Sequence, residues 1–302
     1  MLSRHLRSSA ALFSALFLVA CATIDIDLPS VADAPTGEHL PGKIIWHDLL
    51  THDVEGSKRF YNSLFGWEFE SIGSAAGFSS DSTYTLIRHN GNLIGGMIDT
   101  VALNGRDDIS QWVVVMSVGD VDAVSRRFAA DGGEVITAPT DLQRRGRLAL
   151  VRDAEGALLA LLQTRDGDPA DSEPVIDEFL WDELWTSDID GATEFYQGVT
   201  GLQADLLDVD ADQSSNATYR LLKSGETPRV GIMPNPLEGL GPVWVSYLSV
   251  ENPAAITAKV DALGGRIIVE AQARPLGGEV AFIAGPSGAG IAVQTWPLEQ
   301  KD

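Results

Sequence analysis

Two short stretches of the chain place a carboxylate beside tryptophan in a pattern that alternates like a β-strand. Asp48 follows Trp46 by two residues, and Glu183 lies between Trp181 and Trp185 at the same spacing. Because successive side chains of a strand alternate between its two faces, each carboxylate points to the same side as its indole. Burial beside an indole raises the pKa of a carboxyl group. Such a group can act as a general acid or base, or accept a hydrogen bond from a ligand.

Asp48 and Glu183 are therefore the candidate catalytic residues, and a structural role is the alternative. In that role they would hold backbone N–H groups or pair with a basic side chain such as Arg88, Lys223 or Arg229. Recurrence of the carboxylate does not decide between these roles, because it reports shared ancestry as readily as shared use.

Aromatic residues expected on the same faces are the candidate ligand-binding residues, namely Trp46, Tyr84, Trp181, Trp185 and Tyr219. For the two tyrosines, a position in the core or at the rim is the alternative. We expect Trp112 and Trp244, which open their strands, to be core or interface residues. Arg144, Arg145 and Arg147 form a basic cluster that is either a salt-linked loop or an anion-binding site.

The two carboxylates belong to a unit that occurs twice, at an offset of 135 residues that is kept without insertion. Such a constant register indicates a duplicated structural unit, because a looser resemblance would drift at the loops. The matching pairs include Trp46/Trp181, Asp48/Glu183, Thr51/Thr186, Asp53/Asp188, Phe60/Phe195, Tyr61/Tyr196, Gly66/Gly201 and Tyr84/Tyr219.

The elements that must position these residues follow a β-α-β-β-β pattern. The first unit is predicted as a strand over 43–51, a helix over 54–65, and strands over 67–71, 82–89 and 92–100. Asp53 is placed to cap the helix start, Gly66 ends it, and Asn90-Gly91 indicates a hairpin. A second, weakly related unit covers 111–164. The segments 179–233 and 243–296 repeat the first and second units, which gives four units in two tandem pairs.

These motifs carry a resemblance to a known family. The openings of the form strand-Thr-x-Asp-helix-Phe-Tyr-x-x-x-x-Gly, and the turns from Asp153 to Gly156 and from Gly285 to Gly288, resemble the vicinal oxygen chelate superfamily. That superfamily includes glyoxalase I, bleomycin-resistance proteins and extradiol dioxygenases. The Trp-x-(Asp/Glu)-Leu-x-Thr-x-Asp opening looks most like tandem-domain glyoxalase-like proteins often labelled hydroxylases. The resemblance covers residues 43–297 and implies an α+β fold of four βαβββ modules in two domains, each with a cup-shaped pocket.

The resemblance also implies a divalent metal in each cup, held by His, Glu or Gln side chains. The side chains at the matching positions cannot ligate a metal, and the chain has no histidine after His89. His47 is adjacent to one of these positions, but alternation turns it to the opposite face, where we expect a partly exposed strand residue. We therefore expect no metal and no other cofactor. The matching positions are Trp46, Gly95-Gly96, Val113 and Ala160 in the first domain, and Trp181, Val230-Gly231, Val245 and Ala292 in the second.

The first residues read as an export signal. Two arginines precede a short apolar run, and Leu18-Val19-Ala20-Cys21 resembles a bacterial lipobox, so residues 1–20 are expected to be a cleaved lipoprotein signal peptide and Cys21 to be lipidated. The bilayer would then be a partner through acylated Cys21, and the mature chain a membrane-anchored lipoprotein, at the outer membrane or facing the periplasm in a Gram-negative host. An ordinary secretory signal is the alternative.

The remaining chain divides into a tether over 21–42, a first domain over 43–164, a linker over 165–177 and a second domain over 178–298.

Composition limits the partners. The formal net charge of −22 disfavours nucleic acid, which a protein binds through clustered basic residues. The single cysteine excludes an intramolecular disulfide. Three functions remain: an exported, metal-free protein that binds a small, partly apolar molecule; a glyoxalase- or dioxygenase-like enzyme that uses Asp48 or Glu183 or unrecognised metal ligands; and a non-catalytic interaction protein with closed cups. The oligomeric state is left open.

Overall fold

The structure is a computed structural model that describes residues 28–74, 83–101, 109–208, 218–274 and 277–296. Four modules follow one another in the chain, and each consists of a strand, a helix and three further strands. The first two modules are β1 (Ile44–Thr51), α1 (Val54–Phe65), β2 (Glu68–Ser74), β3 (Thr83–His89) and β4 (Asn92–Asp99), then β5 (Gln111–Ser117), α2 (Val121–Ala130), β6 (Glu134–Asp141), β7 (Gly146–Arg152) and β8 (Leu158–Thr164).

The second half of the chain repeats this order. A short 3-10 turn, η1 (Asp261–Leu263), extends the last helix. The third and fourth modules are β9 (Phe179–Thr186), α3 (Ile189–Thr200), β10 (Gln203–Asp208), β11 (Thr218–Ser224) and β12 (Thr227–Pro234), then β13 (Val243–Val250), α4 (Pro253–Val260), β14 (Arg266–Ala273), β15 (Glu279–Ala284) and β16 (Gly290–Thr295).

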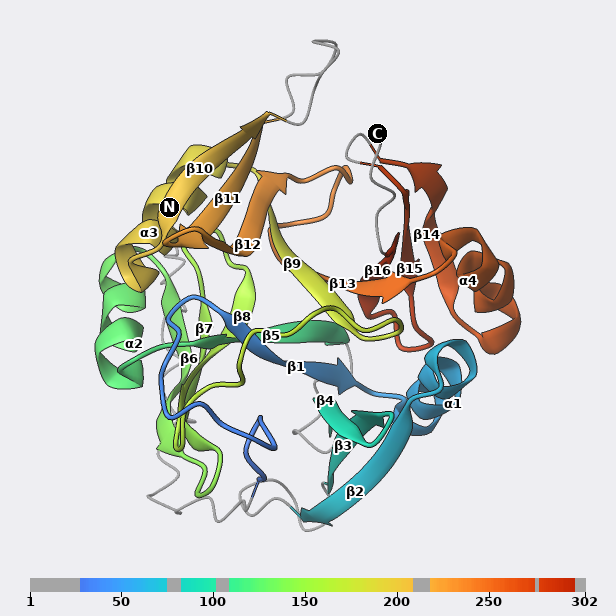
Figure 1. Cartoon of the computed structure of the whole chain (residues 1–302), viewed down its shortest axis with the longest axis horizontal. Coiled ribbons are helices and arrows are strands. Elements are labelled where there is room, and N and C mark those ends of the chain that lie inside the picture. The colour runs from blue at the N-terminus through green and yellow to red at the C-terminus, as the bar shows by residue number, and fades with distance from the viewer. Residues whose placement is uncertain (1–27, 75–82, 102–108, 209–217, 275–276, 297–302) are drawn as a thin grey trace, which may run out of the picture.

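Each pair of modules forms one eight-stranded sheet (Figure 1). The strand orders are β2-β3-β4-β1-β5-β8-β7-β6 and β10-β11-β12-β9-β13-β16-β15-β14. The first strands of the two modules pair antiparallel at the centre, and each also pairs in parallel with the last strand of its own module. This arrangement confirms the predicted α+β fold of four βαβββ modules in two tandem domains.

The helices of the first and third modules begin and end where the sequence predicts. The Asp53 and Asp188 side chains accept hydrogen bonds from backbone N–H groups at 2.8 and 3.0 Å, which satisfies a donor that a helix start leaves free. Gly66 and Gly201 end these helices with φ of 71° and 78°, a left-handed conformation that glycine adopts without a Cβ clash. Capping therefore defines both ends of the two helices through local interactions.

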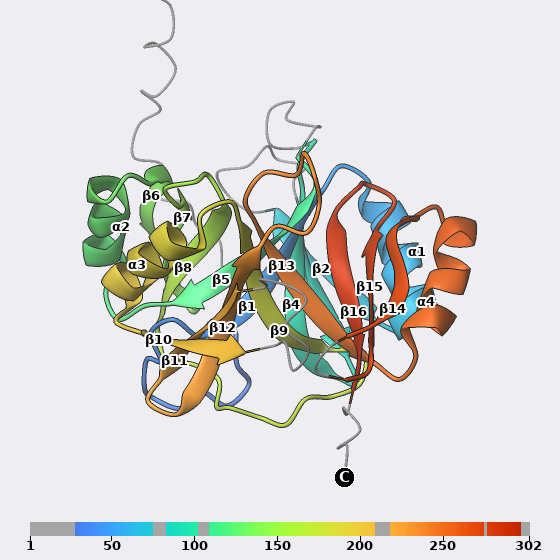
Figure 2. The same ribbon diagram turned by 90° about the horizontal axis from the view of Figure 1, so that it is seen from above.

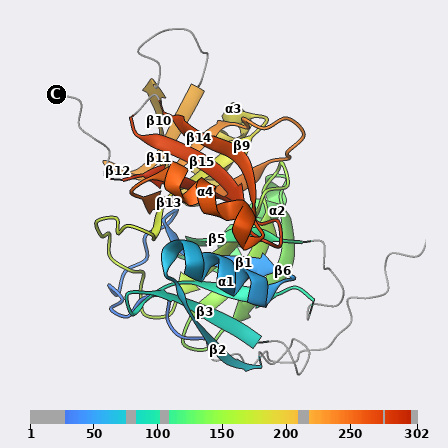
Figure 3. The same cartoon turned by 90° about the vertical axis from the view of Figure 1, so that its right-hand side faces the viewer.

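The helices pack across the domain boundary. In Figure 2, α2 lies beside α3 at one end of the molecule and α1 lies beside α4 at the other, and these pairs are in contact. The Tyr196 hydroxyl on α3 donates to Asp153 of the first domain at 2.9 Å and accepts from Trp244 at 3.0 Å. Figure 3 shows α4 stacked against α1 in the same way. The two domains thus share their outer hydrophobic cores.

His47 lies in one of these shared regions, and its predicted partial exposure is wrong. Its Nε2 lies 3.0 Å from Asp182 Oδ1, and its ring stacks on Phe179 with 3.7 Å between centroids. Asp182 also accepts a hydrogen bond from Ser246 at 2.7 Å. Residue 182 is the repeat equivalent of residue 47, so the two matching strands meet here. Alternation gives the face on which His47 lies, but the second domain covers that face.

The predicted signal peptide and Cys21 lie outside the described residues, whereas the predicted tether is described from Leu28 onward. That part packs against the first domain. The backbone N–H of Thr36 donates to the carbonyl oxygen of Asp168 in the linker at 3.0 Å. The backbone N–H of Leu40 donates to the Asp168 side chain at 2.6 Å. Leu28 and Val31 are buried with the inner side chains of the first sheet. In Figure 1 this segment, in blue, lies between the β2–β4 and β6–β8 arms of that sheet.

Within the part of the chain that the structure describes, no helix has both the length and the apolar character needed to cross a membrane.

Candidate functional site

The candidate site residues lie on the inner faces of the two sheets, opposite the helices. We call the inner face of the first sheet around Asp48 the first cup, and the corresponding face around Glu183 the second cup. Strand register places Gly96 and Val113 beside Asp48 on neighbouring strands, and Gly231 beside Glu183. The residues that sequence analysis singled out from each domain are thus brought together, although they come from different strands.

Glu183 lies at the floor of the second cup and has no solvent exposure. Its Oε1 accepts a hydrogen bond from the Tyr219 hydroxyl at 2.8 Å. Its Oε2 accepts from the Tyr247 hydroxyl at 2.5 Å and from Trp185 Nε1 at 3.2 Å. Trp181 Nε1 donates to the Tyr219 hydroxyl at 2.9 Å, which links this indole to the same network. A molecule that exchanges a proton with Glu183 would have to reach an enclosed carboxylate whose two oxygens already accept these hydrogen bonds.

Arg274, which sequence analysis did not single out, supplies the countercharge. Its guanidinium lies 3.6 Å from Glu183 Oε1 and 5.5 Å from the ring centroid of Tyr247, and it donates to Gln294. A buried carboxylate is costly unless it is hydrogen-bonded and its charge is compensated. Three neutral donors and one cation meet both requirements for Glu183.

The first cup repeats this arrangement with a shorter carboxylate. Asp48 Oδ1 accepts from the Tyr84 hydroxyl at 2.5 Å and from Trp46 Nε1 at 3.0 Å. Arg145 Nη1 donates to the Tyr84 hydroxyl at 3.0 Å, and the guanidinium lies 4.6 Å from the Trp46 ring centroid. Each cup therefore combines a carboxylate, a tyrosine, a tryptophan and an arginine.

The basic partners considered from the sequence are wrong. Arg88, Lys223 and Arg229 pair with Glu70, Asp205 and Asp171 respectively, away from the two candidate carboxylates. The arginines that act in the cups come instead from equivalent hairpins, β6–β7 for Arg145 and β14–β15 for Arg274. The sequence signal that could have located these arginines is their position shortly before the glycine of each hairpin turn, Gly146 or Gly277. That signal is weak because the two loops differ in length. The two arginines therefore do not have the sequence offset that relates the strands of the two units.

Glycine on the strand beside each carboxylate makes room for the tyrosine. A Cβ atom at Gly96 would lie 1.8 Å from the Tyr84 hydroxyl and 2.3 Å from Asp48 Oδ1. A Cβ atom at Gly231 would lie 2.0 Å from the Tyr219 hydroxyl. Any larger side chain at these two positions would displace the tyrosine from its carboxylate.

These side chains do not fit a divalent metal ion. A metal site of this kind needs three or four nitrogen or oxygen ligands from protein side chains. The strand positions next to Asp48 carry Gly96 and Val113, and the carboxylate is already engaged by Tyr84 and Trp46. Among the described residues, no three His, Cys, Asp or Glu side chains are grouped so that they could hold an ion.

Trp112 and Trp244 lie in the outer cores. Trp112 Nε1 donates to Tyr61, and Trp244 Nε1 donates to Tyr196, both at 3.0 Å. Both indoles are buried, as expected for core residues.

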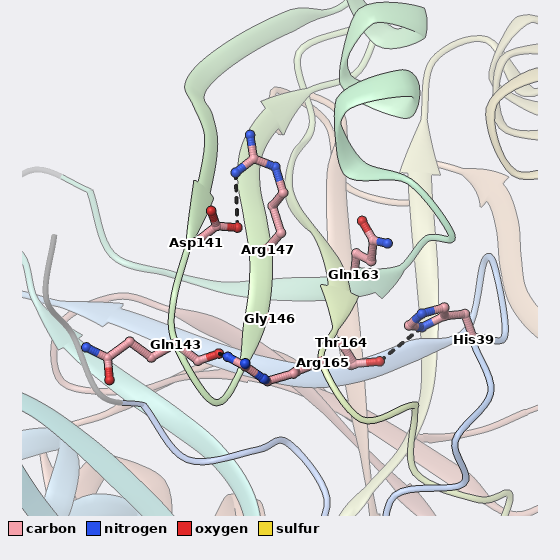
Figure 4. A pocket seen from close by; sticks show the side chains of 8 residues that line it. All are labelled: His39, Asp141, Gln143, Gly146, Arg147, Gln163, Thr164 and Arg165. Atoms are coloured by element: carbon pink, nitrogen blue, oxygen red, sulfur yellow. Dashed lines mark hydrogen bonds and ion pairs between the residues drawn. The ribbon is translucent and has the colours of Figure 1, made fainter. Parts of the chain in front are cut away.

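The predicted basic cluster is divided between two places. Arg145 enters the first cup, whereas Arg147 pairs with Asp122 at 2.7 Å and Asp141 at 3.1 Å. Arg147 borders a polar cavity of about 390 Å³ at the β6–β7 hairpin, outside the cup (Figure 4). Arg165 also lines this cavity, and its Nη1 donates to the Gln143 carbonyl at 2.9 Å. Both cations are engaged within the protein, and the lining of the cavity includes none of the candidate catalytic or ligand-binding residues. Its lining residues are His39, Asp141, Gln143, Gly146, Arg147, Gln163, Thr164 and Arg165.

Comparison with known families agrees with this geometry. The family model of the Glyoxalase/Bleomycin resistance protein/Dioxygenase superfamily matches residues 43–161 and 176–293 of the chain. The chain belongs to this superfamily. CFP32 of Mycobacterium tuberculosis, whose name gives it as a candidate glyoxylase, is 31% identical over 258 residues, which are 85% of this chain and 95% of that protein. The anthracycline biosynthesis protein DnrV of Streptomyces peucetius is 30% identical over 266 residues, 84% of this chain and 93% of the relative.

Solved structures share the fold at low sequence identity. The Mn(II)-bound glyoxalase from Novosphingobium aromaticivorans superposes with a TM-score of 0.56 at 15% identity, over 87% of this chain and 85% of that one. A 2,2',3-trihydroxybiphenyl 1,2-dioxygenase from Sphingomonas wittichii has a TM-score of 0.53 at 14% identity, over 85% and 90%. At this distance the likeness concerns the fold alone.

Burial raises the pKa of every tyrosine in the chain. For Tyr84 and Tyr219 the neighbouring carboxylate adds to this effect, because a tyrosinate would repel it. The phenols therefore stay protonated and keep donating to Asp48 and Glu183 across the physiological range. The five tyrosines are Tyr61, Tyr84, Tyr196, Tyr219 and Tyr247.

Titration of tyrosinate absorbance at 295 nm tests this protonation. A group whose pKa is higher in the folded state contributes stability below its unfolded pKa, here about 10, and loses it as the pH rises further. We expect almost no tyrosinate at pH 10 and a single rise at higher pH that coincides with loss of the near-ultraviolet circular dichroism. The chain unfolded in guanidinium is the control and should titrate at about pH 10. A gradual rise near pH 10 with the native spectrum retained would contradict the burial of these hydroxyls.

Proposed function

We propose that the second cup binds a small, flat, partly apolar molecule. The observation that carries this proposal is the difference in exposure between the equivalent indoles. Trp46 in the first cup is only 2% exposed, whereas Trp181 in the second cup remains partly exposed. In the same way Arg145 is 1% exposed, and the Arg274 side chain is 18% exposed. The second cup thus presents to solvent the surface that the first cup covers.

The side chains around Trp181 suggest the chemistry of the ligand. They are apolar and partly exposed, and they surround the polar floor formed by Glu183 and its donors. Small-molecule sites in proteins combine apolar walls with a few polar groups that fix the orientation of the ligand. Arg274 at the rim would donate to a carbonyl or carboxylate oxygen. The partly exposed apolar residues are Trp181, Met233, Leu237, Val243, Val280 and Phe282.

The name of one relative suggests a class of ligand. The name of DnrV connects it with anthracycline biosynthesis, and anthracyclines are flat, fused-ring molecules with carbonyl oxygens. The name of CFP32 points instead to an enzyme. We favour binding because Glu183 is enclosed and both of its oxygens accept hydrogen bonds. In this proposal Asp48 and Glu183 position their neighbouring side chains, and the cups work without a metal.

Binding of anthraquinone-2-carboxylate, followed by quenching of tryptophan fluorescence, tests the proposal. We expect one molecule per chain in the second cup and about tenfold weaker binding for Arg274→Gln. A charge-assisted hydrogen bond contributes roughly 1.5–3 kcal/mol, and about 1.4 kcal/mol corresponds to tenfold. Arg220→Gln is the matched control, because Arg220 pairs with Asp190 on the surface of the same domain. Equal affinities of the two variants, or no binding by the native chain, would refute the proposal. Consumption of the probe would favour the enzyme.

We also propose that the chain is exported and anchored to a membrane through lipidated Cys21. The support is the sequence of residues 1–21, with its basic start, apolar run and small residues before the only cysteine.

Intact mass spectrometry and fractionation in the native host test this anchor. The mature chain should lack residues 1–20, carry acyl groups on Cys21 and fractionate with membranes. Cys21→Ser should lose both the acyl mass and the membrane association. A chain that retains residues 1–20, or a Cys21→Ser variant that fractionates like the wild type, would contradict lipidation.

A further inference from the structure

Arg145 in the first cup has an unused hydrogen-bond donor. The residue is only 1% exposed, and its Nη2 has no hydrogen-bond partner among the described residues. Its other nitrogens donate to the Tyr84 hydroxyl at 3.0 Å and to the Pro29 carbonyl at 3.1 Å. Arginine is rarely buried without full pairing, and an unsatisfied buried donor is unfavourable. The site around Arg145 therefore has room for more acceptor oxygen than the described residues supply.

The group that now faces Arg145 is the chain's own N-terminal segment. Leu28 and Val31 are 6% and 5% exposed and belong to the same buried cluster as Trp46 and Tyr84. Between them, Pro29 offers its carbonyl oxygen to Arg145 Nε. The segment thus fills the first cup as a ligand would, with two apolar side chains and one acceptor oxygen.

This segment makes fewer hydrogen bonds to the rest of the protein than the residues that follow it. Thr36 and Leu40 hydrogen-bond to Asp168, and Lys43 forms an ion pair with Asp171 at 2.8 Å. Between described residues, by contrast, the stretch 28–34 makes one hydrogen bond to the rest of the protein, the one from Arg145. Residues 35–43 can therefore stay attached while 28–34 leaves the cup.

The geometry of the guanidinium indicates what would compete with the segment. Nε–H and one N–H of Nη2 point from the same edge, which is where a carboxylate binds through two parallel hydrogen bonds. The Pro29 carbonyl uses only one of these two donors. A carboxylate would accept hydrogen bonds from both donors. An apolar chain attached to it would take the place of Leu28 and Val31.

We propose that residues 28–31 are an internal ligand of the first cup, and that their release opens a site for an apolar carboxylate, such as a fatty acid, bound by Arg145. The segment competes with the external ligand for the same donors and the same apolar wall. This proposal concerns the first cup and does not depend on what the second cup binds.

Calorimetric titration with decanoate tests the proposal, with decanol as the control that lacks the carboxylate. The variant Leu28→Asp/Val31→Asp, made in the full chain, should release the segment. We expect it to bind decanoate at least tenfold more tightly than the wild type, and decanol much more weakly. The gain should persist in an Arg274→Gln background, which separates it from the second cup.

Adding Arg145→Gln to the release variant should abolish the gain, whereas Arg165→Gln should leave it unchanged. If Arg145→Gln fails to fold, the comparison of decanoate with decanol still decides the role of the carboxylate. Equal decanoate affinity in wild type and release variant, equal affinity for decanoate and decanol, or no binding at all would each overturn the proposal.

Discussion

A carboxylate at the floor of each cup requires compensation, and the surrounding side chains follow from that requirement. Removing a carboxylate from water is unfavourable unless donors and a positive charge replace its hydration. Glu183 accepts three hydrogen bonds and lies near the Arg274 guanidinium. Asp48 accepts two hydrogen bonds, one of them from the Tyr84 hydroxyl, to which Arg145 donates. Glycine on the neighbouring strand leaves space for the tyrosine. The resemblance to metal-binding members implies a ligating side chain at or next to Gly96 and Gly231, where a Cβ atom would meet the tyrosine hydroxyl.

Duplication preserved this floor while the surroundings of the two cups diverged. The first cup carries a segment of its own chain above Arg145, and the second leaves Trp181 and Arg274 partly exposed. Outside the cups, strands at equivalent positions of the two domains contact each other. An example is the pair of His47 on β1 and Asp182 on β9. The outer packing therefore fixes the sheets, while the inner faces remain free to differ in what covers them.

Local pattern predicted much of this molecule, and long-range packing accounts for what it missed. The modules and the helix caps follow from periodicity and from residues such as Asp53 and Gly66, whose effects are local. Alternation also placed Asp48 and Trp46 on one face. Arg274 was missed, and Arg145 was assigned to a basic cluster rather than to a cup, because the loops that carry them break the register of the repeat. The packing of Leu28 and the burial of His47 depend on surfaces that are distant in sequence, and no local pattern reports them.

The central claim is that a hydrogen-bonded carboxylate closes the floor of each cup in place of a metal centre. The most direct test is to measure the metal content of the protein purified from its native host, and again after incubation with Mn²⁺ or Zn²⁺ and desalting. The account predicts no stoichiometric ion in either sample. One tightly bound ion per domain, lost when Asp48→Asn or Glu183→Gln is introduced, would contradict it.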